Sequence, residues 1–292
     1  MTMRTLWRLC CCFLVVNGLL VGWGSTHRRQ AELRVVFLDV GQGDAAAIES
    51  PSGKVLLIDT GGVLADGSDN EGRRVVGPYL RSRGVRRIDM ELLTHPHADH
   101  IGGAATLLER FPTAELLDNG QQTDSLLLTH LRTDAAEHHV QYLAARRGQT
   151  LDFQDGVTAR ILSPTEAETH GSPNNASIVL LIQYGRTTFL FTGDAEADEE
   201  ADLLAAHQLL PCDVLKVGHH GSRTSTTPPF LAAAHPRIAV ISVGAHNLYG
   251  HPSGEVLDRL RDSGVKVYRT DKQGAVTCTS DGLTVRTETM NP

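Results

Sequence analysis

Residues 92–103 read LLTHPHADHIGG, and this stretch decides how the rest of the chain is interpreted. Three histidines and an aspartate fall within six residues, between an apolar run and two glycines. The pattern is compatible with a metal cage, a polar turn or a pH-sensitive surface. Pro96 keeps the segment extended, so His95 and His97 point to the same side and suit one cation. Asp99 and His100 begin a helix that turns back toward the same spot, where they suit a second cation.

The composition indicates a folded globular chain and argues against one class of partner. Of the 292 residues, 21% are charged and 41% are hydrophobic, a mixture too apolar for a disordered chain. The formal net charge of −7 provides no global basic field for coating nucleic acid. A nuclease is not excluded, because bound divalent cations add local positive charge.

Residues 1–24 differ from the rest of the chain. Arg4 and Arg8 precede an apolar run of 16 residues, LCCCFLVVNGLLVGWG, that ends in small residues spaced like a signal-peptidase site. We expect a signal peptide cleaved near Gly24. An N-terminal membrane anchor is the alternative, although the apolar run is shorter than the roughly 20 residues needed to span a bilayer. Residues 25–32 then form a linker, and we expect residues 33–292 to form one domain outside the cytoplasm, either secreted or periplasmic, or anchored to the outer face of the membrane.

The cysteines exclude a sulfur-ligated metal site. Cys10, Cys11 and Cys12 lie in the leader, which leaves Cys212 and Cys278, two thiols without metal-ligand spacing. Any metal must therefore be held by histidine and carboxylate side chains.

Apolar runs alternate with amphipathic ones along the chain, a pattern typical of a mixed α/β fold in which helices cover sheets. We expect strands at 34–40, 45–50, 55–59, 90–94, 158–162, 178–184, 188–192, 214–217, 238–243, 265–268 and 275–279. We expect helices at 73–83, 99–110, 125–136, 196–208 and 253–262. The polar region 119–154 is the best place for an insertion or a mobile loop.

Several other strand ends carry polar side chains on glycine-rich turns. Asp194 closes FLFTGD, where it either caps the next helix or, together with HPHADH, bridges two cations. His219 and His220 lie in GHHGS, and at least one of them completes the second cation site. Asp59 in DTGG and the pair Asp39 and Asp44 in DVGQGD either lie beside the site or are turn residues.

These residues carry a resemblance. HPHADH, TGD, the histidine near 219 and DTGG resemble the metallo-β-lactamase superfamily, which implies a four-layered αββα sandwich. LDVGQGDA, NNASIVLLI, FLFTGDAE, VLKVGHHGS and YGHPSGEVL are similar to the hydrolase domain of the ComEC/Rec-type DNA-internalisation proteins, from residue 33 to the C-terminus. The many membrane helices of the full-length proteins are not matched.

The resemblance implies roles for the polar residues. His95 and His97 bind one cation, Asp99, His100 and either His219 or His220 bind the other, Asp194 bridges them, and Asp59 orients the cage from behind. Many members place a further histidine where this chain reads SPNNASIV, and His170 lies just upstream. With fewer nitrogen ligands, one or two ions of either zinc or manganese are implied.

The resemblance also implies a reaction. A cation lowers the pKa of water from about 15.7 to about 7, so no serine or cysteine nucleophile is needed. Asp99 orients the water. His251 either contacts a phosphate, protonates the leaving group, or only begins a helix. Tyr249 either stacks on a base or packs in the core. Further candidate substrate contacts are Asn175, Ser222 and Arg223.

The function expected from these residues is that of a phosphodiesterase or nuclease degrading or processing DNA strands outside the cytoplasm, with a membrane DNA-uptake channel as an expected partner. A hydrolase of a small ester, lactone or phosphodiester and a metal-binding accessory protein of DNA uptake with little catalysis remain alternatives. DNA binding requires Arg223, Arg237, Arg269 and Lys272 to gather at the site, against the acidic segment 196–200.

Overall fold

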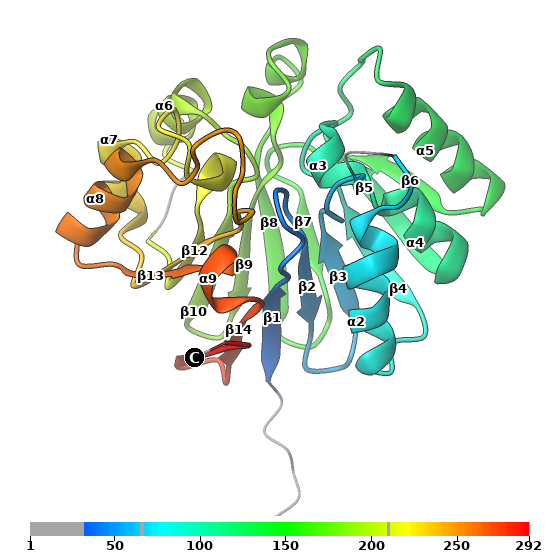
Figure 1. The fold of residues 1–292 in the computed structure, drawn as a ribbon, viewed down its shortest axis with the longest axis horizontal. Helices are drawn as coiled ribbons and strands as arrows, with labels where there is room; N and C mark the ends of the chain where they lie inside the picture. The colour runs from blue at the N-terminus through cyan, green and yellow to red at the C-terminus, as the bar shows by residue number, and fades with distance from the viewer. Residues whose placement is uncertain (1–31, 65–66, 209–210, 292) are drawn as a thin grey trace, which may run out of the picture. The chain divides into compact units, whose positions relative to one another are not determined.

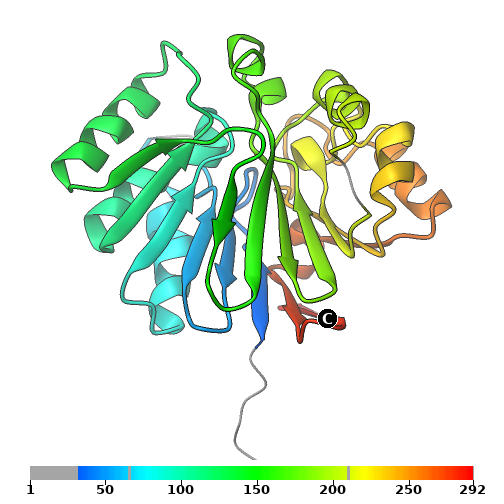
Figure 2. The same cartoon turned by 180° about the vertical axis from the view of Figure 1, so that it is seen from behind.

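The computed structural model describes residues 32–64, 67–208 and 211–291, and these residues form one compact unit of two β-sheets flanked by helices (Figures 1 and 2). The leader predicted at residues 1–24 and most of the linker after it lie outside the described residues. None of the helices within the described ranges has the length and apolarity needed to cross a membrane.

The first sheet has eight strands in the order β15-β14-β1-β2-β3-β4-β5-β6. Their bounds are β1 Leu33–Phe37, β2 Ala46–Glu49, β3 Val55–Ile58, β4 Ile88–Leu92, β5 Thr113–Asp118, β6 Gln141–Ala144, β14 Val276–Ser280 and β15 Val285–Thr289. The second sheet has seven strands in the order β13-β12-β11-β10-β9-β8-β7. Their bounds are β7 Thr150–Asp152, β8 Val157–Ser163, β9 Val179–Tyr184, β10 Thr187–Phe191, β11 Val214–Lys216, β12 Ile238–Ile241 and β13 Lys266–Arg269.

Helices cover the outer face of each sheet. Against the first sheet lie the π-helical turn η1 Gly72–Val76, α2 Gly77–Ser82, α3 Ala98–Ile101, α4 Ala104–Arg110 and α5 Leu126–Glu137. Against the second lie α6 Ala197–Ala205, α7 Pro228–Ala234 and α8 Gly254–Asp262. Short turns complete the chain: η2 Glu168–His170, η3 Asn174–Ala176, η4 Gly218–Gly221 and α9 Thr270–Gln273.

The hydrophobic cores explain the layering. The alternating inward residues of both sheets, such as Val35, Phe37, Ile182 and Phe189, form one buried cluster between the sheets. Separate clusters lie between each sheet and its helices, because strands buried on both faces present apolar side chains to both sides. The four layers α, β, β and α confirm the fold class expected from the sequence.

The mobile loop expected as one alternative for residues 119–154 is not what the structure shows. This region contains α5, the edge strand β6 and the edge strand β7, so it completes both sheets. β6 is mostly exposed and β7 is short, and neither has the apolar alternation by which a strand is recognised. The amphipathic helix expected at 125–136 is present as α5.

Strand direction brings the polar turns together. β1, β3 and β4 run parallel to one another, and β10, β11 and β12 do the same in the second sheet. Their carboxyl ends therefore lie at one edge, where the loops after them hold Asp44, Asp59, His95, Asp194 and His220. Open α/β sheets bind ligands at such an edge.

Candidate metal centre

Asp59 and the segment after β4 form the buried wall of the site. The Asp59 carboxylate accepts hydrogen bonds from the Thr94 amide (2.8 Å), the Thr94 hydroxyl (2.8 Å) and His100 Nδ1 (2.8 Å). Since His100 gives its Nδ1 proton to Asp59, its Nε2 faces the opposite side, toward the interior of the site. Asp59 therefore lies behind His100 and fixes the orientation of the ring.

Glycines allow these segments to approach closely. A Cβ atom on Gly103 would lie 2.4 Å from the Thr60 carbonyl oxygen, and one on Gly43 would lie 2.4 Å from the Asp99 carbonyl oxygen. The glycine pair that ends LLTHPHADHIGG thus lets the helix start pack directly against the turn after β3.

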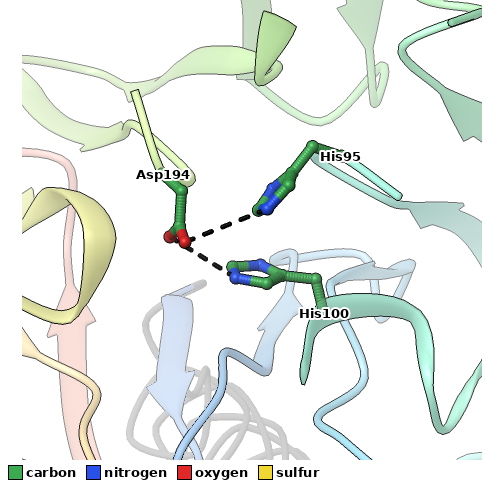
Figure 3. A group of neighbouring side chains, drawn as sticks. All are labelled: His95, His100 and Asp194. Atoms are coloured by element: carbon green, nitrogen blue, oxygen red, sulfur yellow. Dashed lines mark ion pairs between the residues drawn. The ribbon is translucent and has the colours of Figure 1, made fainter. Parts of the chain in front are cut away.

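Asp194 lies at the centre of the site. Its Oδ1 is 3.4 Å from His100 Nε2, and its Oδ2 is 3.9 Å from His95 Nε2 (Figure 3). The Asp194 amide donates a hydrogen bond to Ser177 Oγ at 3.1 Å, which anchors the turn after β10. One carboxylate therefore faces histidines from both parts of HPHADH.

His220 and His219 reach the same carboxylate from the turn after β11. His220 Nδ1 donates to the Ser242 carbonyl (3.0 Å), so its Nε2 faces Asp99 Oδ2 (3.3 Å) and Asp194 Oδ2 (3.7 Å). His219 Nε2 is also 3.7 Å from Asp194 Oδ2, but its ring is 23% exposed, whereas His220 is buried. Both residues adopt left-handed backbone, with φ of 49° and 54°, a strained conformation typical of functional sites.

The unpaired atoms of the cage fit a divalent cation. Among the described residues, His100 Nε2, His220 Nε2 and Asp194 Oδ1 are buried without a hydrogen-bond partner. Buried polar atoms without partners are rare in native proteins. Two donors on one tetrahedral zinc ion lie about 3.4 Å apart, close to the 3.4 Å and 3.3 Å separations seen here. The sets His95, His100, Asp194 and Asp99, His100, His220 are each compact enough to share an ion.

The charges of the cage lead to the same conclusion. Burial opposes a charged imidazole, but Asp194 and Asp59 hold the pKa of His100 well above its usual range. Against the same burial, Asp194 and Asp44 raise the pKa of His220 to about 10. Burial would raise the pKa of Asp99, yet contacts with His220 and His100 lower it to about 2. Protons thus neutralise the carboxylates of the metal-free chain, and cations would displace them.

Asp44 contacts the cage more closely than its turn motif indicated. Asp39 is an exposed turn residue, whereas Asp44 is buried and its Oδ2 lies 2.6 Å from Lys216 Nζ. Asp44 Oδ1 lies 3.4 Å from His220 Nδ1, and Lys216 also donates to the Val217 carbonyl at 2.9 Å. The ion pair joins the first sheet to the second directly behind the cage. DVGQGD indicated Asp44 as a residue near the site, but nothing in the sequence marked Lys216 as its partner.

The chain provides fewer donors at the first of the two predicted cation positions than at the second. His97 is exposed, and its Nδ1 lies 3.0 Å from His95 Nε2. Ser177 Oγ lies 3.5 Å from His95 Nδ1, on the side of the ring away from Asp194. Asn175 Oδ1 accepts from the Glu196 amide (3.0 Å), so it holds the start of α6, and His170 is exposed on η2.

A cleft of about 350 Å³ opens beside the cage. It is lined by Gln42, His97, Ala98, Asp99, Asp194, His219, His220, Tyr249 and His251. Burial, His219 and His220 lower the pKa of His251, so this imidazole is neutral at pH 7 and suits a hydrogen bond to phosphate better than proton donation. Ser222 is buried against Thr224, while Arg223 is exposed and forms no ion pair within the described part of the chain.

The cations expected to gather on this face do not all do so. Arg237 precedes β12, at the sheet edge opposite the cage, and Arg269 is paired with Asp271 at 2.6 Å. The acidic segment 196–200 is also less repulsive than expected, because Glu199 and Glu200 are buried. Of the four cations, Arg237 therefore lies away from the cage and Arg269 is neutralised by its ion pair.

Comparison with known proteins identifies the class. The chain matches the family described as Metallo-beta-lactamase superfamily over residues 38–246, and it belongs to that family. The chain is 35% identical to ComE operon protein 3 of Bacillus subtilis over 257 residues, 84% of this chain and 33% of that protein. It is 33% identical to competence protein ComA of Neisseria gonorrhoeae over 246 residues, 84% of this chain and 32% of that protein.

The chain is thus related to competence proteins and spans about a third of the length of these two relatives. A solved structure, CmlA, a diiron beta-hydroxylase from Streptomyces venezuelae, shares the fold with a TM-score of 0.51 and 15% identity. That likeness covers 81% of this chain and 52% of CmlA.

Proposed function

We propose that this chain is a metal-dependent phosphodiesterase that cleaves DNA strands outside the cytoplasm. The observation that carries the proposal is the convergence of His100 Nε2, His220 Nε2 and Asp194 Oδ1, all buried and without hydrogen-bond partners among the described residues, beside an open cleft. The relationship to competence proteins supports DNA as the substrate, and the leader-like residues 1–24 support export.

Each residue of the cage has a role in this proposal. His95 and His97 would hold one divalent cation, Asp99, His100 and His220 would hold a second, and Asp194 lies where it would serve both, with zinc or manganese as the metal. The bound cation supplies Lewis acidity and lowers the pKa of water to about 7. Asp99, ionised at neutral pH and exposed to the cleft, accepts a hydrogen bond from the attacking water and orients it.

The remaining residues bind the phosphate. His251 lies across the cleft, with its ring centroid 5.6 Å from that of His219, and donates a hydrogen bond to a phosphate oxygen. Arg223, exposed directly after η4, contacts the same phosphate or its neighbour. Buried Ser222 supports that turn through its hydrogen bond with Thr224, and Asn175 holds the start of α6.

The test measures cleavage by the purified full chain with zinc or with manganese, on bis(4-nitrophenyl) phosphate and on single- and double-stranded DNA. We expect DNA cleavage that is lost with chelator and falls at least about 100-fold in the variants His95→Ala and Asp194→Asn. His170→Ala is the matched control, because this histidine is exposed outside the cage.

Three results would overturn the proposal in different ways. Cleavage of the small phosphodiester without DNA would assign the site to a small substrate. Activity only on a carboxylic ester or lactone would exclude phosphodiester chemistry. No hydrolysis with either metal, together with DNA uptake that survives His95→Ala in cells, would favour an accessory role.

A further inference from the structure

Two large apolar side chains stand exposed at the mouth of the cleft. Leu248 is 99% exposed and Tyr249 is 72% exposed, although most large apolar residues of the described chain are buried. Both lie in the loop between β12 and α8, and Tyr249 lines the cleft together with Asp99 and Asp194. Exposed apolar side chains beside a polar site are typical of a ligand-binding surface.

The loop that presents these side chains is held in place. Asn247 Nδ2 donates to the Gly244 carbonyl (2.9 Å) and to the His251 carbonyl (2.7 Å), and its Oδ1 accepts from the His251 amide (2.9 Å). One side chain thus closes the loop on both sides of its tip. Leu248 and Tyr249 are exposed on a fixed backbone, which lowers the entropic cost of binding a ligand there.

The rings form a row that leads to the cage. Tyr249 stacks on His251 with ring centroids 5.7 Å apart and an angle of 25° between the planes. His251 meets His219 edge to face at 5.6 Å, and His219 Nε2 is 3.7 Å from Asp194. His251 covers one face of the tyrosine ring, so the solvent-exposed face is free to stack on a planar group of the substrate.

We propose that Tyr249, flanked by Leu248, stacks on an unpaired nucleobase of the strand whose phosphate lies at the cage. This inference rests on the proposed phosphodiesterase function and names its substrate class as single-stranded nucleic acid. The exposed ring supports it, because stacking on an aromatic side chain is a sequence-tolerant way to hold an unpaired base, and Tyr249 is 72% exposed beside the cleft. A base held in a duplex cannot stack on Tyr249 without leaving its own stack.

Tyr249 is a specificity residue under this proposal. The test removes the tyrosine ring by substitution and, separately, removes the base from the substrate strand. The substrates are a single-stranded oligonucleotide and the same strand carrying an abasic residue at each position around the cleaved bond. Alanine substitution of a stacking aromatic costs about 5- to 150-fold per base, so Tyr249→Ala should lower kcat/KM on the intact strand by that factor. Removing the stacked base should lower the kcat/KM of the unmodified protein by a similar factor. It should lower the kcat/KM of the Tyr249→Ala protein much less.

A binding measurement supplies a readout independent of cleavage. With metal-free protein, a strand carrying 2-aminopurine at the position found by abasic scanning should lose fluorescence on binding, and Tyr249→Ala should abolish that quenching. Tyr249→Phe keeps the ring and should restore both quenching and kcat/KM. Leu126→Ala is the matched control, because Leu126 is 73% exposed at the start of α5, outside the cleft.

The outcomes separate this inference from the proposed function. Equal costs of base removal in the unmodified and Tyr249→Ala proteins would refute stacking while leaving the phosphodiesterase intact. Failure to cleave any strand, abasic strands included, would instead refute the proposed function. A preference for duplex over single strands that Tyr249→Ala leaves unchanged would also overturn the inference.

Discussion

The buried ion pair between Lys216 and Asp44 yields a quantitative prediction. Both side chains are almost fully buried, with exposures of 4% and 7%, and they join the two sheets behind the cage. Breaking a buried pair by removing one partner costs about 3–5 kcal/mol. Without Lys216, the Asp44 carboxylate keeps only the imidazoles of His220 (3.4 Å) and His100 (4.0 Å), which are more distant than the ammonium at 2.6 Å. Lys216→Met should therefore lower the free energy of unfolding of the metal-free protein by about that amount, as should Asp44→Asn.

The double variant tests whether the cost comes from the pair itself. Asp44→Asn combined with Lys216→Met leaves no unpaired charge, so it should lose at least about 2 kcal/mol less than the sum of the single variants. Urea unfolding at pH 7.5 in chelator measures all four proteins. A Lys216→Met protein that loses under 1 kcal/mol, or single losses that simply add, would show that the pair does not act as a unit.

Three further predictions concern protons and metal. Glu91 is buried without a hydrogen-bond partner among the described residues, and burial raises its pKa from 4.5 to about 8. Its contribution to stability is therefore full below pH 4.5 and is lost as the pH rises toward 8. Glu91→Gln should remove about 3 kcal/mol of the change in unfolding free energy between pH 4.5 and 7, measured by urea unfolding. The same pH dependence of the unfolding free energy in both proteins would contradict this. Zinc or manganese at about 100 times its Kd should add about 2.7 kcal/mol to stability, seen as a higher Tm that chelator reverses, and an unchanged Tm would exclude a cation site. His220→Ala should weaken metal binding in calorimetry more than His97→Ala does, and the reverse order would assign the stronger position to His95 and His97.

How far the sequence could predict the site depends on how its donors are distributed. HPHADH places four polar side chains within six residues, so local geometry alone was enough to bring His95, His97, Asp99 and His100 together. Asp194 and His220 follow separate strands of the second sheet, where glycine-rich turns at strand ends marked them as candidate ligands and the resemblance supported those roles. Their meeting with His100 depends on parallel strands ending at one edge, which is a property of the whole fold.

Lys216 could not be predicted in the same way. It ends the apolar strand VLK, where a lysine usually extends to solvent, and its partner Asp44 lies 172 positions earlier in the chain. Only the packing of the two sheets brings Nζ within 2.6 Å of the carboxylate. The edge strands β6 and β7 were also not predicted, because partly exposed strands lack the apolar alternation that burial imposes on a strand's sequence.

The two cation positions differ in how firmly the protein holds their donors. At the second position, Asp59 orients His100, Ser242 orients His220, and both rings are buried with Nε2 directed inward. At the first, His97 is exposed, and Ser177 and Asn175 occupy the stretch in which many members of the superfamily have a further histidine. Fixed imidazoles bind metal more tightly than mobile ones, because hydrogen bonds to the rear nitrogen set the tautomer and the ring orientation. In the proposed two-cation site, the second position should therefore bind its cation first, and at the first position solvent or a substrate oxygen would complete the ligands.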